Sequence, residues 1–322
     1  MKKPLTVLLA LALALAGCSL ITLDFTPRIR PLEEQTVEGA GRAKILLVDV
    51  SGFLSEEGAS PSLVIGTAPP RVPLLVRLRE ELTKAAADAD VRALLVRINS
   101  PGGTVTAADI ICRELETWKR ETGRPVVAVM LDVAASGGYY VALAADTIVA
   151  HPTSVTGSIG VIMVSLNAEG LMQKIGLAAA TIKSGERKDM GSPLRALTVE
   201  ERKIFQSVID SLYAQFVAKL VASRRLAPET ARAIADGRIY TAQQALELGL
   251  LDRVGYMPDA IEAARRAAGV GEARVIVYHR PREYRATYYA SAQAPASGPD
   301  AALLQLATML GAGPRFLYLW WP

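Results

Sequence analysis

A serine stands where a buried strand is expected to turn into a helix. Residues 124–131 (RPVVAVML) form a short Val-rich run typical of buried strands, and residues 141–145 (VALAA) favour a helix. Between them, Ser136 is followed by Gly137 and Gly138, which permit a tight turn and close approach of a ligand. A hydroxyl beside the free N–H groups of a helix start supplies what acyl transfer needs, a nucleophile and an oxyanion hole. The same residues also suit an ordinary turn, so this stretch alone leaves both interpretations open.

Such a nucleophile needs a base, and the sequence offers two kinds. His151 and His279 are the two histidines of the chain, and neither lies in a glycine-rich setting typical of a site. Lys183 and Lys188 belong to the polar run KSGERKD. A lysine acts as a base near neutral pH when its pKa falls from about 10.4 to about 7, which burial or nearby positive charge can achieve. The sequence pattern alone does not identify the base. For each histidine a structural role, and for each lysine a solvent-exposed position, is a simpler interpretation than a catalytic role.

The elements that would position Ser136 alternate between strand and helix. Strands are expected over 44–50, 91–98, 125–131 and 146–150, and helices over 74–87 and 106–122. This alternation predicts an α/β domain. A second glycine turn, NSPGG at 99–103, also follows a strand and precedes a helix. Because sites gather at the carboxyl ends of strands in α/β sheets, we expect the two turns to face one cleft.

The second half of the chain continues the alternation less regularly. A strand-like run is expected over 155–165, a strand over 178–183 and a last strand over 274–278, with helices over 168–175, 228–235, 241–248 and 259–268. Another helix is expected to begin at Thr198, where Thr-Val-Glu-Glu resembles a capping pattern. The final aromatic run, FLYLWW at 316–321, is interpreted as packing against the domain. Occupation of a substrate cleft and contact with a membrane surface are the alternatives.

The first residues resemble an export signal. A positively charged start precedes an apolar run over 5–16, which is too short for a comfortable membrane span. The run ends in LAGC, which resembles the lipobox of bacterial lipoproteins and predicts lipidation at Cys18. We therefore expect a signal peptide over 1–18, a polar linker over 19–43 and a domain held on the extracytoplasmic face of a membrane. An uncleaved N-terminal anchor is the alternative.

The amino-acid composition limits which classes of partner and cofactor are expected. Hydrophobic residues make up 51% of the chain and charged residues 21%, so a sizeable core is expected. The formal net charge of +4 is spread along the chain and forms no basic, aromatic-interleaved patch, which argues against nucleic acid as a partner. With Cys18 assigned to lipidation, Cys112 is the remaining cysteine, and its helical apolar setting predicts an inert core thiol. We expect no metal and no other cofactor.

Six motifs in order resemble the signal peptide peptidase A family in its short bacterial form. They are VDVSG (48–52), INSPGG (98–103), ASGGYY (135–140), TGSIGVI (156–162), KSGERKD (183–189) and GRIYTAQQALELGLLD (237–252). The resemblance implies the fold of the Clp protease and crotonase superfamily, an α/β spiral of ββα units with peripheral helices. It places the peptidase domain over 44–280 and a C-terminal tail over 281–322. Thr104 departs from the family pattern, since many members carry a further glycine there.

The resemblance also assigns roles to single residues. Ser136 matches the family's nucleophile, Lys188 its general base, and Ser158 a serine that orients the lysine. Gly103 and Gly137 match the backbone donors of the oxyanion hole. A homo-oligomer is implied, in which one site takes its serine and its lysine from neighbouring subunits. The implied protein is a membrane-tethered serine endopeptidase that cleaves remnant signal peptides and other apolar segments, bound as an added strand.

Two functions of other classes compete with this one. A crotonase-like enzyme acting on acyl-CoA would share the fold and the oxyanion hole, but export argues against it because coenzyme A is a cytoplasmic cofactor. A non-enzymatic lipoprotein scaffold with an inactive site is the second alternative. The presence of both Ser136 and Lys188 argues against such degeneracy.

Overall fold

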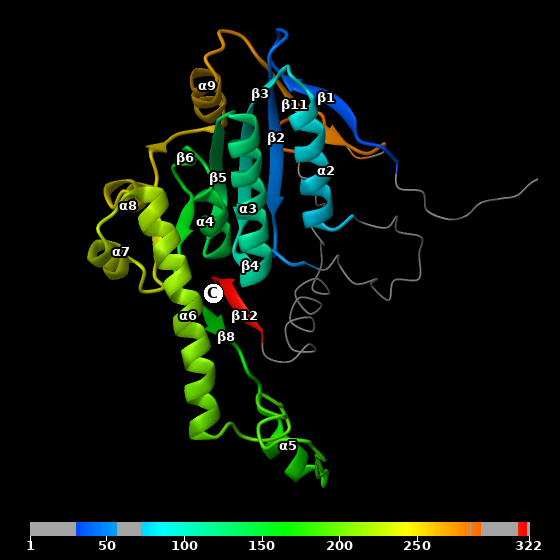
Figure 1. Cartoon of the computed structure of the whole chain (residues 1–322), viewed down its shortest axis with the longest axis vertical. Helices are drawn as coiled ribbons and strands as arrows, with labels where there is room; N and C mark the ends of the chain where they lie inside the picture. Colours follow the sequence, from blue (N-terminus) through cyan, green and yellow to red (C-terminus); the bar gives the residue numbers. More distant parts are fainter. Residues whose placement is uncertain (1–29, 57–71, 282, 284, 291–314, 321–322) are drawn as a thin grey trace, which may run out of the picture.

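The fold is built on a large, mainly parallel sheet (Figure 1). The computed structural model describes residues 30–56, 72–281, 283, 285–290 and 315–320. The sheet has nine strands, and its main path runs β1 (Glu33–Glu38), β11 (Arg274–His279), β2 (Lys44–Ser51), β3 (Val91–Ser100), β5 (Val126–Ala135), β6 (Thr147–Ala150) and β10 (Arg253–Val254). Among the described strands of this path, only β1 runs antiparallel to its neighbour. The predicted α/β class is confirmed.

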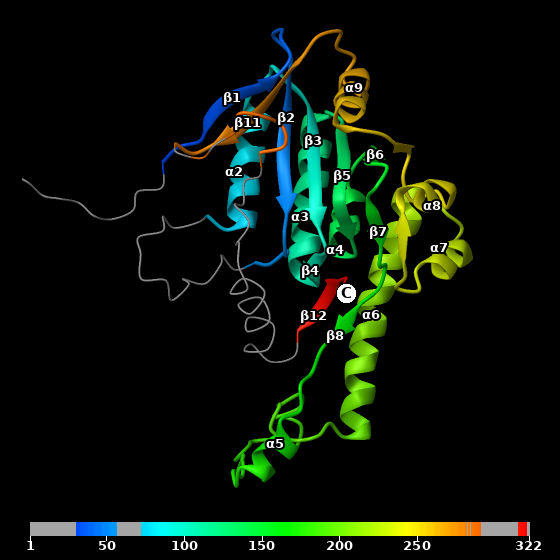
Figure 2. The ribbon, with the colours of Figure 1, turned by 180° about the vertical axis from the view of Figure 1, so that it is seen from behind.

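The central strands β2, β3 and β5 are buried on both faces, which explains their nearly continuous apolar sequences. One face packs against α2 (Leu74–Ala87), α3 (Val105–Thr122) and the short α4 (Gly137–Ala142). The other face packs against α9 (Met257–Ala267). Figure 2 shows the same ribbon from behind. The Thr104 hydroxyl accepts a hydrogen bond from the Ala107 N–H at 3.1 Å, so this departure from the family pattern serves as the N-cap of α3.

The strand β5 pairs with different neighbours along its length. Its first part, from Val127 to Met130, pairs with β6, whereas its last part, from Val133 to Ala135, pairs with β7 (Val155–Gly157). β7 in turn pairs antiparallel with β9 (Ile239–Thr241). The sheet therefore branches along β5, with β6 beside its first part and β7 beside its last part. A separate three-stranded antiparallel sheet, made of β4 (Gly102–Thr104), β12 (Phe316–Leu319) and β8 (Ile162–Met163), lies next to this end.

A long helix and the segment before it reach away from the sheet. The helix α6 (Val199–Arg224) begins with the predicted capping box, since Thr198 and Glu201 exchange side-chain hydrogen bonds with each other's backbone N–H. Its second half packs beside α7 (Pro228–Ile234), and α8 (Ala242–Glu247) lies close to β7, β9 and β10. Its first half leads to residues 164–198, here called the arm, which hold α5 (Glu169–Lys174) (Figures 1 and 2).

The side chains of the arm are more exposed to solvent than those of the sheet and its covering helices. One prediction from the sequence fails in this segment. No residue of α5 is buried, and large apolar side chains of the arm are exposed: Val164, Leu166, Leu171, Ile175, Leu177, Ile182 and Leu194. The strand predicted over 178–183 is wrong, because these described residues form no strand and are exposed throughout. A strand there would have no neighbour to pair its backbone groups. The apolar residues that suggested a strand are unburied within one chain.

The two ends of the domain extend further than the sequence indicated. Part of the segment expected as a linker forms β1, which pairs with β11 at the edge of the sheet. In the tail, the carbonyl groups of Tyr288 and Ala290 accept hydrogen bonds from Arg97, a fully buried residue that is also paired with Asp49. The expected signal peptide and Cys18 lie outside the described residues. Within the described part of the chain, no helix combines the length and hydrophobicity that crossing a bilayer requires.

Candidate active site

Ser136 lies at the junction of β5 and α4, where the sequence predicted a strand-to-helix turn. Its φ of 51° and ψ of −112° form a left-handed conformation that is costly for a residue with a side chain. A Cβ atom on Gly138 would lie 2.6 Å from the Ser100 carbonyl oxygen, so this close approach requires glycine. Ser136 is 1% exposed, and its Oγ has no hydrogen-bond partner among the described residues. A buried hydroxyl without a partner costs free energy, which marks this serine as unusual.

The NSPGG turn meets the turn that carries the serine, as the sequence predicted. Leu54 borders β4 on one side: its N–H donates to the Gly102 carbonyl at 2.9 Å, and its carbonyl accepts from the Thr104 N–H at 2.8 Å. Because peptide groups alternate in direction along a strand, the Gly103 N–H faces the other side. A Cβ on Gly102 would lie 2.8 Å from the Gly137 nitrogen, so the two turns touch. The pairing of Gly103 and Gly137 as oxyanion donors stays a prediction, and this arrangement supports it.

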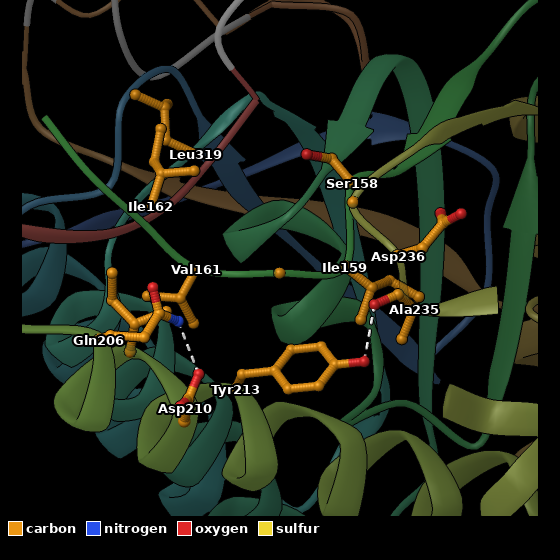
Figure 3. Close-up of a pocket in the computed structure, with 13 residues that line it drawn as sticks. Ser158, Ile159, Val161, Ile162, Gln206, Asp210, Tyr213, Ala235, Asp236 and Leu319 are labelled. Atoms are coloured by element: carbon orange, nitrogen blue, oxygen red, sulfur yellow. Dashed lines mark hydrogen bonds between the residues drawn. The ribbon is translucent and has the colours of Figure 1, made fainter. Parts of the chain in front are cut away.

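Ser158 reaches the same place from the neighbouring strand. The parallel register of β5 and β7 sets Ala135 beside Gly157, and the Ser136 N–H donates to the Gly157 carbonyl at 2.8 Å. Ser158 is therefore next to the serine turn, with a φ of 49° and with its own N–H bonded to the Arg238 carbonyl at 2.7 Å. The hydroxyl of Ser158 points toward the side of a cavity where Leu319 lies (Figure 3). This position suits the orienting role that the resemblance implies.

The structure does not bring Lys188 next to Ser136 within one chain. Lys188 is exposed in the arm, which lies away from α4 in both views (Figures 1 and 2). Lys183, the other lysine of KSGERKD, is held in place: its ammonium group donates to the Glu186 carbonyl and to the Asp189 carboxylate, each at 2.7 Å. No described residue forms a side-chain contact of this kind with Lys188. Of the two lysines, Lys188 is thus the one whose amino group is available to another molecule.

A charged cluster fixes the loop that carries Lys188. Arg195 forms two hydrogen bonds with the Asp189 carboxylate, at 2.7 and 3.0 Å, and two with the Glu201 carboxylate, at 2.5 and 2.9 Å. These hydrogen bonds lower the pKa of Glu201 to about 2 and hold the pKa of Asp189 well below its usual range. The carboxylates therefore stay ionised at neutral and mildly acidic pH, and their contribution to the loop is lost only as the pH falls through these lowered values.

If Lys188 is the general base, as the resemblance implies, replacing Arg195 by alanine is expected to lower kcat by about 10- to 100-fold, because a loosened loop no longer holds Lys188 at a fixed position. The melting temperature tests whether the fold is intact. The matched control is Arg202→Ala, which removes an exposed arginine near the start of α6. Wild-type kcat in the Arg195→Ala protein would contradict the positioning role.

The C-terminal strand β12 lies between β4 and β8. It is antiparallel to both, with Tyr318 opposite Gly103 and Leu317 opposite Ile162. A last backbone contact joins the Trp320 N–H to the Pro101 carbonyl at 2.9 Å. The tail thus packs on its own domain, as expected. β12 also lies beside the two glycine turns, and occupation of a substrate cleft stays an alternative interpretation of the aromatic run.

A cavity of about 430 Å³ opens beside Ser158 and the end of β12. Figure 3 shows Ser158, Val161, Ile162 and Leu319 around it, with Tyr213 from α6. The Tyr213 hydroxyl donates to the Ala235 carbonyl at 2.8 Å, which fixes the ring at the wall of the cavity. The cavity is large enough to accept a side chain the size of lysine next to Ser158.

The two histidines and the described cysteine have structural contacts in the fold. His151 contacts the Thr153 hydroxyl at 2.9 Å and packs edge-on against Tyr256. His279 ends β11 at the opposite part of the sheet. Cys112 is buried in α3, and burial raises the pKa of its thiol to about 12, so it is an inert core thiol as predicted. Within the described part of the chain, no cluster of His, Cys, Asp or Glu could hold a metal ion.

Two parts of the site were missed by the sequence analysis. The Arg195 cluster could have been suspected from the alternating charges of residues 183–201. The second part is the aromatic wall that α6 contributes, where Phe216 lies 5.0 Å from Tyr140 and 4.7 Å from Tyr318 between ring centroids. The sequence around Phe216 gave no signal that this face of α6 borders the two glycine turns.

Comparison with known proteins finds a matching family profile and proteins of similar sequence. Residues 118–271 match the sequence profile of peptidase family S49. A protein of Enterococcus faecium named after signal peptide peptidase SppA is 36% identical over 246 residues, which cover 76% of this chain and 70% of that protein. The chloroplastic serine protease SPPA of Arabidopsis thaliana is 34% identical over 71% of this chain and 33% of its own length. Protease 4 of Salmonella typhi is 35% identical over 58% of this chain and 30% of its own length. The chain thus spans about a third of the two longer relatives.

Proposed function

Because the chain belongs to peptidase family S49, whose fold is ClpP-like and crotonase-like, we propose that it is a serine endopeptidase in which Ser136 is the nucleophile and Lys188 the general base. The observation that carries the proposal is the buried, unpartnered Oγ of Ser136 at the meeting point of two glycine turns. Ser136 attacks the peptide carbonyl, and the N–H groups of Gly103 and Gly137 stabilise the oxyanion. Ser158 orients the lysine.

The lysine comes from a neighbouring subunit. Lys188 lies in the arm, away from Ser136 of its own chain, while the arm exposes apolar side chains such as Leu171 and Ile182. A second copy of the chain is the partner that would cover these side chains and bring Lys188 to the cavity beside Ser158. A lysine acts as a base in its neutral form, which burial away from water favours. Each active site is therefore completed in the homo-oligomer.

The substrates are extended apolar peptide segments, including remnant signal peptides. β4 and β8 hold an extended strand between them, which is the geometry of strand addition. Such a cleft favours a peptide over an acyl-CoA molecule, which has no backbone to pair with two strands. The export signal expected over 1–18, with Cys18 as its lipidation site, tethers the enzyme to a membrane on the extracytoplasmic face, where such segments remain after secretion.

Covalent labelling tests the nucleophile. A serine-directed phosphonate carrying an apolar peptide should modify the purified protein once per chain, and peptide mapping should place the modification on Ser136. The control is Ser136→Ala, which should stay unmodified. The Ser158→Ala protein should still be labelled at Ser136, more slowly, because its nucleophile remains. A label that appears on Ser158, or an unreactive wild-type protein, would overturn the assignment.

A further inference from the structure

The hydroxyl of Ser100 is buried at the end of β3, between the chain that leaves β2 and the NSPGG turn. Ser100 is 0% exposed. Its Oγ donates to the Gly52 carbonyl at 2.6 Å and accepts a hydrogen bond from the Gly102 N–H at 3.1 Å. Because the proton of this hydroxyl is engaged, Ser100 contrasts with Ser136, whose Oγ has no partner among the described residues. The Ser100 hydroxyl therefore serves to join two backbone segments.

A proline creates the gap that this hydroxyl fills. The strands β2 and β3 are parallel, and their ladder continues through the Gly52 N–H, which donates to the Asn99 carbonyl at 2.9 Å. In a parallel ladder the carbonyl of the same residue accepts from the N–H two residues further along the neighbouring strand, which here is residue 101. Pro101 has no N–H to donate. The Ser100 hydroxyl supplies the missing donor, so a side chain completes the ladder.

The segment after Gly52 holds the strand that carries Gly103. Leu54 lies two residues beyond Gly52, and its N–H and carbonyl both bond to the backbone of β4, at 2.9 and 2.8 Å. A Cβ on Gly103 would lie 1.9 Å from the Leu54 carbonyl oxygen, so the two backbones are in close contact. The Ser100 hydroxyl thus holds both sides of this contact, one through the Gly52 carbonyl and the other through the Gly102 N–H.

The backbone of Ser100 also contacts the turn of the nucleophile. Ser100 pairs with Ala134, which lies two residues before Ser136 on β5. A Cβ on Gly138 would lie 2.6 Å from the Ser100 carbonyl oxygen. One buried residue therefore borders both turns that hold the candidate oxyanion donors. Such donors act at about 2.7–3.1 Å from the oxyanion, so a small displacement of either turn weakens them.

We propose that Ser100 is a positioning residue of the oxyanion hole: its hydroxyl joins the Gly52 carbonyl to the Gly102 N–H and so sets the place of the Gly103 N–H. The proposal rests on the proposed function, in which the Gly103 N–H stabilises the oxyanion. Ser100 acts through Gly103 and takes no part in making or breaking bonds. Its loss acts on the transition state, where charge develops on the oxygen, and leaves the binding of the peptide unchanged.

Steady-state kinetics of the Ser100→Ala protein with an apolar peptide test the proposal. We expect kcat to fall by about 10- to 100-fold and KM to change by less than about twofold. The matched control is Ser154→Ala, since the Ser154 hydroxyl is also buried and bonds to the Met130 and Leu131 carbonyls, outside the two glycine turns. The control should keep the wild-type kcat, although its melting temperature should fall about as much as that of Ser100→Ala.

A second substitution tests the gap that the proline leaves. In the Ser100→Ala/Pro101→Ala protein, residue 101 regains an N–H that can donate to the Gly52 carbonyl. We expect kcat to rise by about 2- to 10-fold above that of Ser100→Ala, the gain that one hydrogen bond gives. Comparison with Pro101→Ala alone separates this gain from any effect of the proline itself. A role of Ser100 in overall stability alone would not produce such a recovery of kcat.

The outcomes separate this proposal from the proposed function. A Ser100→Ala protein that keeps the wild-type kcat, or loses activity only through a higher KM, would overturn the positioning role and leave the peptidase assignment intact. A double variant no more active than Ser100→Ala would overturn it as well, because the Gly52 carbonyl would then not need the donor. A folded wild-type protein that hydrolyses no apolar peptide would overturn both proposals.

Discussion

Lys188→Ala and Ser136→Ala proteins should each lose peptide hydrolysis by about 10⁴-fold or more, because a nucleophile without its base is nearly as ineffective as no nucleophile. The melting temperature of both variants should stay close to that of the wild type, since within the described part of the chain neither the Lys188 amino group nor the Ser136 hydroxyl has a hydrogen bond to lose. Lys174→Ala is the matched control, because it removes an exposed lysine of the same arm. Retained activity in the purified Lys188→Ala protein would refute its role as the base.

Mixing the two inactive variants tests where the lysine comes from. If each site joins Ser136 of one subunit to Lys188 of its neighbour, oligomers that contain both variants should recover activity. Random assembly of equal amounts would complete about a quarter of the sites in a symmetric ring. Co-expression with two different affinity tags, followed by purification on both, isolates the mixed oligomers. If verified mixed oligomers stay inactive, the serine and the lysine of a site belong to the same chain.

Gly103→Ala should lower kcat by about 10²- to 10³-fold, the range that loss of one oxyanion-hole donor produces. The added Cβ would lie 1.9 Å from the Leu54 carbonyl oxygen and 2.5 Å from its nitrogen, so β4 must shift and carry the Gly103 N–H out of place. The effect should fall on kcat more than on KM, because the donor acts on charge that develops in the transition state.

The control for this prediction is Gly271→Ala, at a position where a Cβ would meet no atom within 4 Å. Its kinetics should equal those of the wild type. Circular dichroism separates a local shift of β4 from unfolding. A Gly103→Ala protein that keeps the wild-type kcat would exclude this N–H group from the oxyanion hole.

Local sequence signals located the strand and the turn around Ser136 well. The Val-rich run at 126–131 and the glycines after Ser136 predicted a buried strand and a tight turn, and both are present. The helix begins at Gly137 rather than at 141, because the left-handed backbone of Ser136 lets the chain turn within a single residue. The local pattern could not show this, since a left-handed serine is stabilised only by the packing around it.

The sequence could not predict contacts between segments that lie far apart along the chain. Nothing in the periodicity of residues 316–319 shows that they pair with residues 102–104, because strand pairing depends on the whole fold. The strand predicted over 178–183 failed for the converse reason: its residues have the right types but no partner within the chain. The role of Lys188 came from the resemblance, and it stays a prediction because one chain does not bring it to Ser136.

The position of β12 has a consequence for the solubility of the protein. Without an occupant, the facing edges of β4 and β8 would present unpaired N–H and C=O groups to the solvent. Exposed edges of this kind are templates on which unrelated chains pair and aggregate. A protein that binds extended segments by strand addition must keep such edges accessible to work. In this structure the C-terminal strand caps both edges and so shields them from such pairing.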